Sequence, residues 1–255
     1  MENLPNKVIH IIKDYAIFKP KAKDELQKAV DLWCEDKEET LKLYGHISNW
    51  DTSLITNMSN LFSEKDKFND NINNWDVSSV MDMNSMFYKA SSFNQPLEQW
   101  NVCNVTKMDC MFHEASSFNQ PLNSWNVCNV TKMDGMFHEA SSFNQPLDKW
   151  DVSKVNSMFS MFMKASSFNQ PLDKWDVSSV TNIGWMFYGA SSFNHSLNSW
   201  DVSSVNNMSY MFEEDVSIDN KNVLWYDWSN KNIFYNNSYN ILRIYLKKSL
   251  LQDEY

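Results

Sequence analysis

Thiol, imidazole and carboxylate side chains occur together in two neighbouring stretches of the sequence. Cys110, His113 and Glu114 lie close together, and a similar stretch further along contains His138 and Glu139. Thiolate and imidazole groups are ligands that zinc prefers at tetrahedral sites. A structural zinc site needs four ligands that converge on one point. The question is therefore whether any fold could bring enough of these groups together.

Two further cysteines, Cys103 and Cys128, occupy equivalent positions in the same two stretches. Cys103 precedes Cys110 by seven residues and is expected on another face, so it would not complete a metal site. The position of Cys103 is taken by serine elsewhere, as at Ser153, which indicates tolerance for any small polar group. We therefore expect duplicated surface residues, without a metal or another cofactor. A disulfide between Cys103 and Cys128 is the remaining alternative.

Aspartates recur at a third position, and their spacing could be taken for calcium binding or for paired acid–base carboxylates. The column consists of Asp76, Asp151, Asp176 and Asp201. It is interrupted by Asn101 and Asn126, and the four glycines of the chain are too few for the Gly-rich turns of calcium-binding repeats. Stacked carboxylates ~4.8 Å apart would raise one another's pKa without any catalytic role. We expect a solvated or backbone-bonding ladder.

No catalytic residue is expected, and the protein is predicted not to be an enzyme. The chain has five histidines, and two of them, His113 and His138, belong to one duplication. No Ser-His-Asp arrangement can be assembled from them, and neither GxxxxGK nor GxGxxG occurs in the sequence.

All of these groups lie within a sequence repeat of constant length. Asn101 to Trp125 recurs as Asn126 to Trp150 with three changes, and the interval from Trp100 to Trp125 is kept by every tryptophan of a column from Trp50 to Trp225. A fixed period between 20 and 50 residues is typical of a repeat array. The consensus is W-D/N-V-S-x-V-T-x-M-x-x-M-F-x-x-A-S-S-F-N-Q-P-L-x-x.

The apolar spacing changes within each repeat. Leu97, Trp100 and Val102 alternate as in a short strand, whereas the apolar residues from Val105 to Ala115 recur every three or four positions, as in a helix. This pattern predicts an α/β solenoid of about eight units, each a short parallel strand followed by a short helix. Ladders of Trp, Val, Met and Phe would form its core, and an Asn ladder that includes Asn119 would bond the backbone at each turn.

Three regions are expected. Residues 1–46 form an N-terminal helical cap, with helices over 22–34 and 36–44; the second has Asp36 as its N-cap and Gly45 as its stop. Residues 47–228 form the repeat array. Residues 229–255 form a capping helix, because the apolar residues Ile241, Leu242, Tyr245 and Leu246 share one helical face.

The composition limits the classes of partner. A net charge of -10 with a single arginine, Arg243, argues against a nucleic-acid ligand, whose phosphates require clustered basic residues. No apolar run reaches the ~18 residues of a membrane helix. The first residues are interrupted by His10, Lys13 and Asp14, so they do not resemble a signal peptide. An intracellular protein is expected, in a host cytoplasm or a virion if it is viral.

The repeats resemble a known family. WDVSSVTNIGWMFYGASSFN and its copies are similar to BspA-like leucine-rich repeats, including the related domain of unknown function described from mycoplasma surface proteins. The same repeat appears in proteins of protists and giant viruses. The resemblance covers roughly residues 20–228. It implies a right-handed leucine-rich-repeat-type coil and, since family members are mostly surface adhesion or binding proteins, an interaction role.

The residues that vary on the outward face of the expected strands are the predicted binding site. A fixed core with a variable polar face is the layout of solenoid recognition surfaces. The expected function is non-enzymatic binding of a protein or glycan; the alternative is a structural or self-assembling component of a particle or surface layer. The predicted binding residues are Asn101, Asn126, Lys149, Asp151, Lys154, Lys174 and Asp176.

Overall fold

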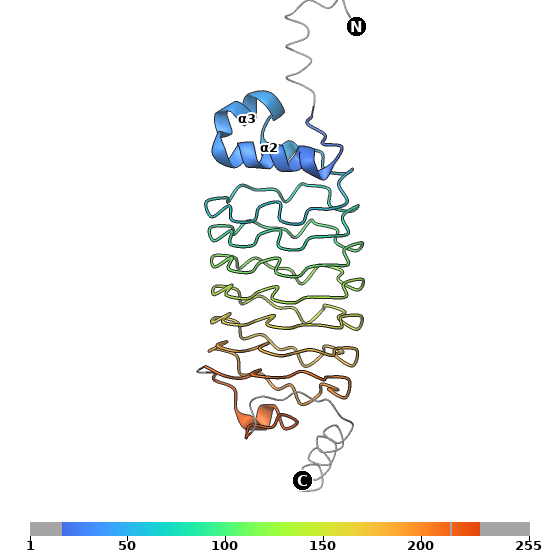
Figure 1. Cartoon of the computed structure of the whole chain (residues 1–255), viewed down its shortest axis with the longest axis vertical. Helices are drawn as coiled ribbons and strands as arrows, with labels where there is room; N and C mark the ends of the chain where they lie inside the picture. Colours follow the sequence, from blue (N-terminus) through green and yellow to red (C-terminus); the bar gives the residue numbers. More distant parts are fainter. Residues whose placement is uncertain (1–16, 215, 230–255) are drawn as a thin grey trace, which may run out of the picture.

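The chain forms an elongated stack of coils with a helical cap at its N-terminal end (Figure 1). The structure is a computed structural model, and it describes residues 17–214 and 216–229. Its helices are α2 (Lys23–Glu35) and α3 (Lys37–Tyr44), with single 3-10 turns at Ile47–Asn49 and Asn220–Asn222. We call each repeat unit a coil, beginning after one tryptophan of the column and ending at the next. The predicted C-terminal capping helix lies outside the described residues.

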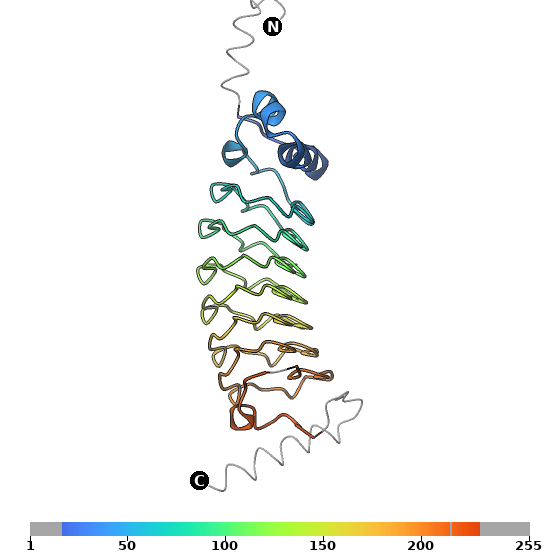
Figure 2. The same cartoon turned by 90° about the vertical axis from the view of Figure 1, so that its left-hand side faces the viewer.

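The two cap helices confirm the sequence prediction to within one residue. α2 buries Leu26, Ala29, Val30 and Trp33 on one face. The helix also contacts the first coil, where the Trp33 indole N–H donates a hydrogen bond to Asp70 Oδ2 at 2.8 Å. The α2 helix therefore covers the first coil and its core (Figure 2). α3 begins where expected, because the Asp36 carboxylate accepts the Glu39 N–H at 3.0 Å. It ends at Gly45, whose φ of +70° favours glycine.

The expected strand-plus-helix repeat is wrong. Between Trp50 and Glu214 the described chain runs through tight turns, without a helix or an extended strand. Pairing between coils is parallel, as expected, but it is limited to isolated bridges at one residue per coil. The bridged residues are Asn57, Asp82, Lys107, Lys132, Ser157, Asn182 and Asn207. The α/β leucine-rich-repeat-like architecture is therefore not the one that this chain adopts.

The predicted helix after Val105 fails because its backbone N–H groups bond to the next coil. The N–H groups of Cys110 and Phe112 donate to the carbonyl oxygens of Asp134 and Met136, at 2.8 and 2.9 Å. Cys110 has a φ of 54°, in the left-handed region, and this turns its N–H out of the path a helix would require. The three- and four-residue apolar spacing has another origin: local turns, such as the one closed by Met111 N–H on Met108 O at 3.3 Å.

The predicted strand at each tryptophan is also a series of turns. Trp125 N–H bonds to Leu122 O at 3.0 Å, and Val130 N–H bonds to Val127 O at 2.8 Å. The Trp125 indole crosses to the preceding coil and donates to Leu97 O at 3.0 Å. Equivalent bonds run from Trp75 to Trp225. Tryptophan therefore recurs at this position because its indole N–H bonds to the preceding coil and because its ring is buried in the core.

The core is one continuous set of side-chain columns. Rings of adjacent coils stack, as at Phe112 and Phe137, whose centroids are 5.6 Å apart. The Asn ladder is confirmed, because Asn119 Oδ1 accepts the Asn144 N–H at 2.9 Å. In the described part of the chain, no helix has the length and apolarity needed to cross a bilayer.

Candidate functional site

One edge of the stack changes its chemistry from coil to coil while the core does not. We call it the variable edge. Its N-terminal half carries histidines and charged residues, and its C-terminal half is aromatic. The N-terminal half comprises Tyr88, Lys89, His113, Glu114, His138, Glu139 and Lys164. The C-terminal half comprises Trp185, Tyr188, Gly189, Tyr210 and Glu214.

The rings of the N-terminal half follow one another from coil to coil and are tilted against each other. The centroid of His113 lies 4.9 Å from that of Tyr88 and 4.1 Å from that of His138. Each imidazole Nε2 faces the following glutamate, at 3.4 Å for Glu114 and 3.6 Å for Glu139. The backbone places them in register, because each coil bonds to the next through the same positions.

Burial keeps this imidazole pair neutral. Burial lowers the pKa of His113 despite the carboxylates of Glu114 and Glu139. Burial, and then the neighbouring His113, lowers the pKa of His138 to about 4. Glu114 and Glu139 are therefore paired chiefly with the ammonium groups of Lys89 and Lys164, at 3.8 and 3.5 Å.

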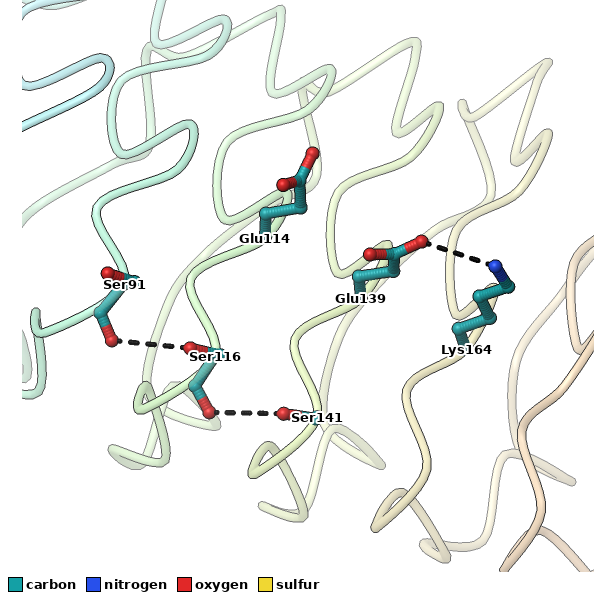
Figure 3. A pocket seen from close by; sticks show the side chains of 6 residues that line it. All are labelled: Ser91, Glu114, Ser116, Glu139, Ser141 and Lys164. Carbon is teal, nitrogen blue, oxygen red and sulfur yellow. Dashed lines mark hydrogen bonds and ion pairs between the residues drawn. The ribbon is translucent and has the colours of Figure 1, made fainter. Parts of the chain in front are cut away.

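A shallow groove of about 420 Å³ lies beside these glutamates (Figure 3). It is lined by Ser91, Glu114, Ser116, Glu139, Ser141 and Lys164. The hydroxyls of Ser116 and Ser141 donate to backbone carbonyl oxygens of the preceding coil, at 3.5 and 3.4 Å. Glu139 is held by Lys164. These polar groups therefore bond to other groups of the stack, and no hydroxyl of the groove is positioned as an activated nucleophile.

The C-terminal half is a cluster of three aromatic rings. The Trp185 ring lies 4.7 Å from the Tyr188 ring and 4.8 Å from the Tyr210 ring, centroid to centroid, with both pairs tilted. Trp185 and Tyr210 have φ values of 60° and 53°, an uncommon conformation for bulky residues. All three side chains are partly exposed. Interaction with the carboxylate of Glu214, in the next coil, raises the pKa of Tyr188.

The coils that carry this edge match one family model twice. The model, described as Mycoplasma protein of unknown function, DUF285, matches residues 35–146 and 122–228. The two matched segments together span more than half of the chain. The chain belongs to the DUF285 family. No curated protein and no solved structure matches it significantly. The resemblance to the mycoplasma repeat is thus confirmed, while the match does not extend to BspA-like leucine-rich repeats.

The seven predicted binding residues of this DUF285 chain are all exposed, but they lie in turns and in the irregular segments between them, and none lies on a strand. The side chains of Asn101 and Asn126 accept the N–H groups of Cys103 and Cys128, both at 3.3 Å. Asp151 likewise accepts the N–H of Ser153 at 3.1 Å. The prediction of a backbone-bonding Asp column is confirmed, since Asp176 makes the same bond to Ser178 at 3.0 Å.

The three predicted lysines have separate partners. Lys154 donates to Asn129 Oδ1 at 2.8 Å, and Lys174 forms an ion pair with Asp148 at 3.1 Å. Lys149 bonds through its backbone N–H to Asn123 Oδ1 at 3.0 Å. The structure therefore does not gather these residues into one pocket. Whether they bind a ligand stays a prediction.

The cysteines and histidines of the DUF285 repeats are placed as duplicated neighbours. All four cysteines are free thiols, and Cys103 and Cys128 are half-buried. Cys110 and His113 do lie together: a Cβ added at Gly135 would be 3.2 Å from Cys110 Sγ and 3.7 Å from His113 Nδ1. Within residues 17–214 and 216–229, no three His, Cys, Asp or Glu side chains are arranged to hold a metal ion.

Sequence reasoning missed the aromatic half of the variable edge. The signal was present where the DUF285 repeat departs from its own consensus: CMFHEA at Cys110 becomes WMFYGA at Trp185. Unlike Cys, His and carboxylate residues, a tryptophan in place of a small residue has no ligand or acid–base chemistry that would single it out. Only the coil stacking shows that Tyr210, in the next repeat, contacts the same ring.

Proposed function

We propose that this DUF285 chain is a non-enzymatic repeat scaffold that binds a partner protein through its variable edge. One observation carries the proposal. The core columns and the bonds between coils use the same residue types in nearly every repeat, whereas the variable edge passes from Tyr, His and charged residues to a Trp–Tyr cluster. A rigid stack with one diversified surface is the arrangement of solenoid binding proteins.

The chemistry of the edge supports binding over catalysis. Tryptophan and tyrosine are enriched at the centres of protein interfaces, where they bury large areas with little loss of entropy. The carboxylates of Glu114 and Glu139 lie in ion pairs, and the adjoining groove is open. The resemblance of the repeats to BspA-like surface repeats, whose members are mostly adhesion or binding proteins, supports the same assignment.

The proposal is tested by comparing two altered faces of the same protein. One bait carries Trp185→Ser and Tyr210→Ser; serine suits these positions, because Ser85 and Ser160 occupy the same column with φ values of 54° and 55°. The matched bait alters the face predicted from sequence, with Lys149→Glu, Asp151→Lys and Lys154→Glu. Both are used beside the wild type for affinity capture from the native source, with quantitative mass spectrometry.

We expect the edge variant to lose at least one partner that the second variant retains. The opposite outcome would assign binding to the turns around Asp151. If every partner survives both sets of changes, the proposal is wrong. Light scattering over a range of concentrations provides the other comparison, since self-association that depends on the edge would favour a structural component of a particle or layer.

A further inference from the structure

The N-terminal half of the variable edge contains a complete site for one ammonium group. The Nζ of Lys89 lies over the Tyr88 ring, 5.1 Å from its centroid. The same Nζ is 3.8 Å from the carboxylate of Glu114, in the next coil. An aromatic face attracts a cation through its quadrupole, and the carboxylate adds a charge of opposite sign. At this site the cation is the ammonium group of Lys89, from the chain itself.

The same arrangement recurs four coils later without that cation. Tyr188 and Glu214 occupy the positions of Tyr88 and Glu114, but Gly189 replaces the lysine. The Glu214 carboxylate lies beside this position, because its Oε2 would be 3.6 Å from a Cβ added at Gly189. In the part of the chain that the structure describes, lysine ammonium groups lie over the rings of Trp33 and Tyr88, and none lies over Tyr188.

The second arrangement has a larger aromatic surface than the first. Trp185 and Tyr210 occupy the positions of Ser85 and Cys110. Their rings lie 4.8 Å apart, and the Trp185 ring is 4.7 Å from the Tyr188 ring. Tryptophan is the strongest of the aromatic side chains in attracting a cation. Three aromatic rings beside a carboxylate are therefore better suited to an ammonium or guanidinium group than the occupied site is.

The neighbouring lysine does not fill this place. The Cγ of Lys164 would lie 3.0 Å from a Cβ added at Gly189, so its stem passes over the glycine. Its ammonium group is directed to the preceding coil, where it lies 3.5 Å from Glu139. The aliphatic part of the Lys164 side chain therefore covers Gly189, while its ammonium group is paired with Glu139.

We propose that Trp185, Tyr188, Tyr210 and Glu214 bind a lysine or arginine side chain of the partner protein. The inference rests on the proposed function, because it names the partner chemistry for the same edge. The net charge of -10 would also attract a basic segment. Gly189 supplies no cation where Lys89 supplies one in the first arrangement, and the ammonium group of Lys164 is held at Glu139.

The direct test uses short peptides that differ at one residue, with the full-length protein. The probes are otherwise uncharged peptides containing one lysine, one arginine or one norleucine, and binding is followed by the shift of the Trp185 indole N–H in ¹H–¹⁵N spectra. Trp185→Ser assigns that resonance. We expect the lysine and arginine peptides to bind at least tenfold more tightly than the norleucine peptide, and Trp185→Ser to abolish binding.

A self-occlusion variant makes the test specific. Gly189→Lys introduces the residue found at Lys89, and the backbone conformation permits it because Lys89 and Glu214 have φ values of 57° and 53° against 66° for Gly189. The flexible stem of Lys164, whose Cγ lies 3.0 Å from the added Cβ, shifts to accommodate this residue or a glutamine. We expect this variant to weaken binding of the lysine peptide at least tenfold. Gly189→Gln, of similar length but without charge, should weaken it less than threefold.

Two results would overturn the inference. One is equal binding of the norleucine and lysine peptides; the other is binding that Trp185→Ser or Gly189→Lys leaves unchanged. A neutral hexasaccharide that shifts the Trp185 indole while the peptides do not would assign the cluster to sugar binding and likewise reject a cationic partner. If the peptides fail while partner capture still depends on Trp185, this inference is wrong and the proposed function stands.

Discussion

The indole N–H of Trp125 donates a hydrogen bond of 3.0 Å to the carbonyl oxygen of Leu97, in the preceding coil. Both groups are buried, with Trp125 3% exposed and Leu97 fully enclosed. The same carbonyl oxygen also accepts the backbone N–H of Trp100 at 3.2 Å, so the indole supplies its second hydrogen bond. The tryptophan column therefore contributes polar bonds between coils in addition to apolar area.

This bond predicts a cost even for a substitution that keeps an aromatic ring. Trp125→Phe should destabilise the protein by about 0.5–1.5 kcal/mol, because the indole bond is lost while Leu97 O keeps the bond from the Trp100 N–H. Trp125→Ala should cost more, ~3–5 kcal/mol, because it also leaves a cavity. Urea unfolding followed by circular dichroism measures both. If Trp125→Phe matches the wild type, the indole bond does not contribute.

The asparagine ladder predicts a smaller loss at another turn of the coil. Asn119 Oδ1 accepts the N–H of Asn144 at 2.9 Å and the side-chain amide of Gln145 at 3.0 Å. Asn119→Ala removes both bonds and should cost about 1–2 kcal/mol. Ser124→Ala, at an exposed position of the same coil, is the matched control and should change the unfolding free energy by less than ~0.5 kcal/mol. Equal effects of the two substitutions would contradict this role.

The buried histidine pair predicts a loss of stability in mild acid. Burial and His113 lower the pKa of His138 from 6.5 to about 4 in the folded protein. The unfolded chain therefore binds a proton between those pH values that the folded chain excludes. The stability due to neutral His138 is complete above about pH 6.5 and is lost as the pH falls towards 4.

Comparison with His138→Gln isolates this contribution. Carboxylates such as Asp151, whose pKa is lowered by the bonds from Ser153, add their own pH dependence to both proteins. The difference in unfolding free energy between pH 7.5 and pH 5 should be smaller in His138→Gln than in the wild type. Identical differences would show that His138 is protonated as readily in the folded as in the unfolded protein.

The near-identity of two coils predicts that one can be removed. Deletion of residues 101–125 joins Trp100 to Asn126, which recreates the original Trp-Asn-Val junction. Because each coil contacts only its neighbours, the shortened stack should fold with lower stability and a smaller urea m-value. The Trp185 indole resonance should be unchanged, since its contacts lie in later coils. A deletion protein that does not fold would contradict this modular account.

The cap helices and core columns were predictable because their residues follow established patterns. Asp36 with Glu39 and Gly45 marks the ends of α3, and Phe112 recurs at the same depth in each coil. The turns of the repeat were not predictable from spacing, because turns closed between residues i and i+3 also bury residues three or four apart. The left-handed backbone conformations of Cys110 and Glu114 could not be predicted either, because neither residue is a glycine.

The candidate site was predictable only in part. The duplicated Cys110, His113 and His138 were found from sequence, and they do lie together. The aromatic cluster was missed because Trp185 and Tyr210 are separated in sequence by one whole repeat, and only the stacking of turns brings their rings together. The face around Asp151 was favoured because it was assigned to a strand, which the chain does not form.

The coils are stacked along the long axis of the molecule (Figure 1), and hydrogen bonds such as that from Phe112 N–H to Met136 O join each coil to the next. A tensile load applied to the two ends would therefore pull each interface open rather than shear it. Every coil that peels away releases one full repeat of chain. At about 3.3–3.6 Å per extended residue, one repeat contains roughly 80–90 Å of extended chain, against the ~4.8 Å that it spans in the stack. Tethered between two bodies, the stack would act as an extensible spring with steps of nearly uniform size.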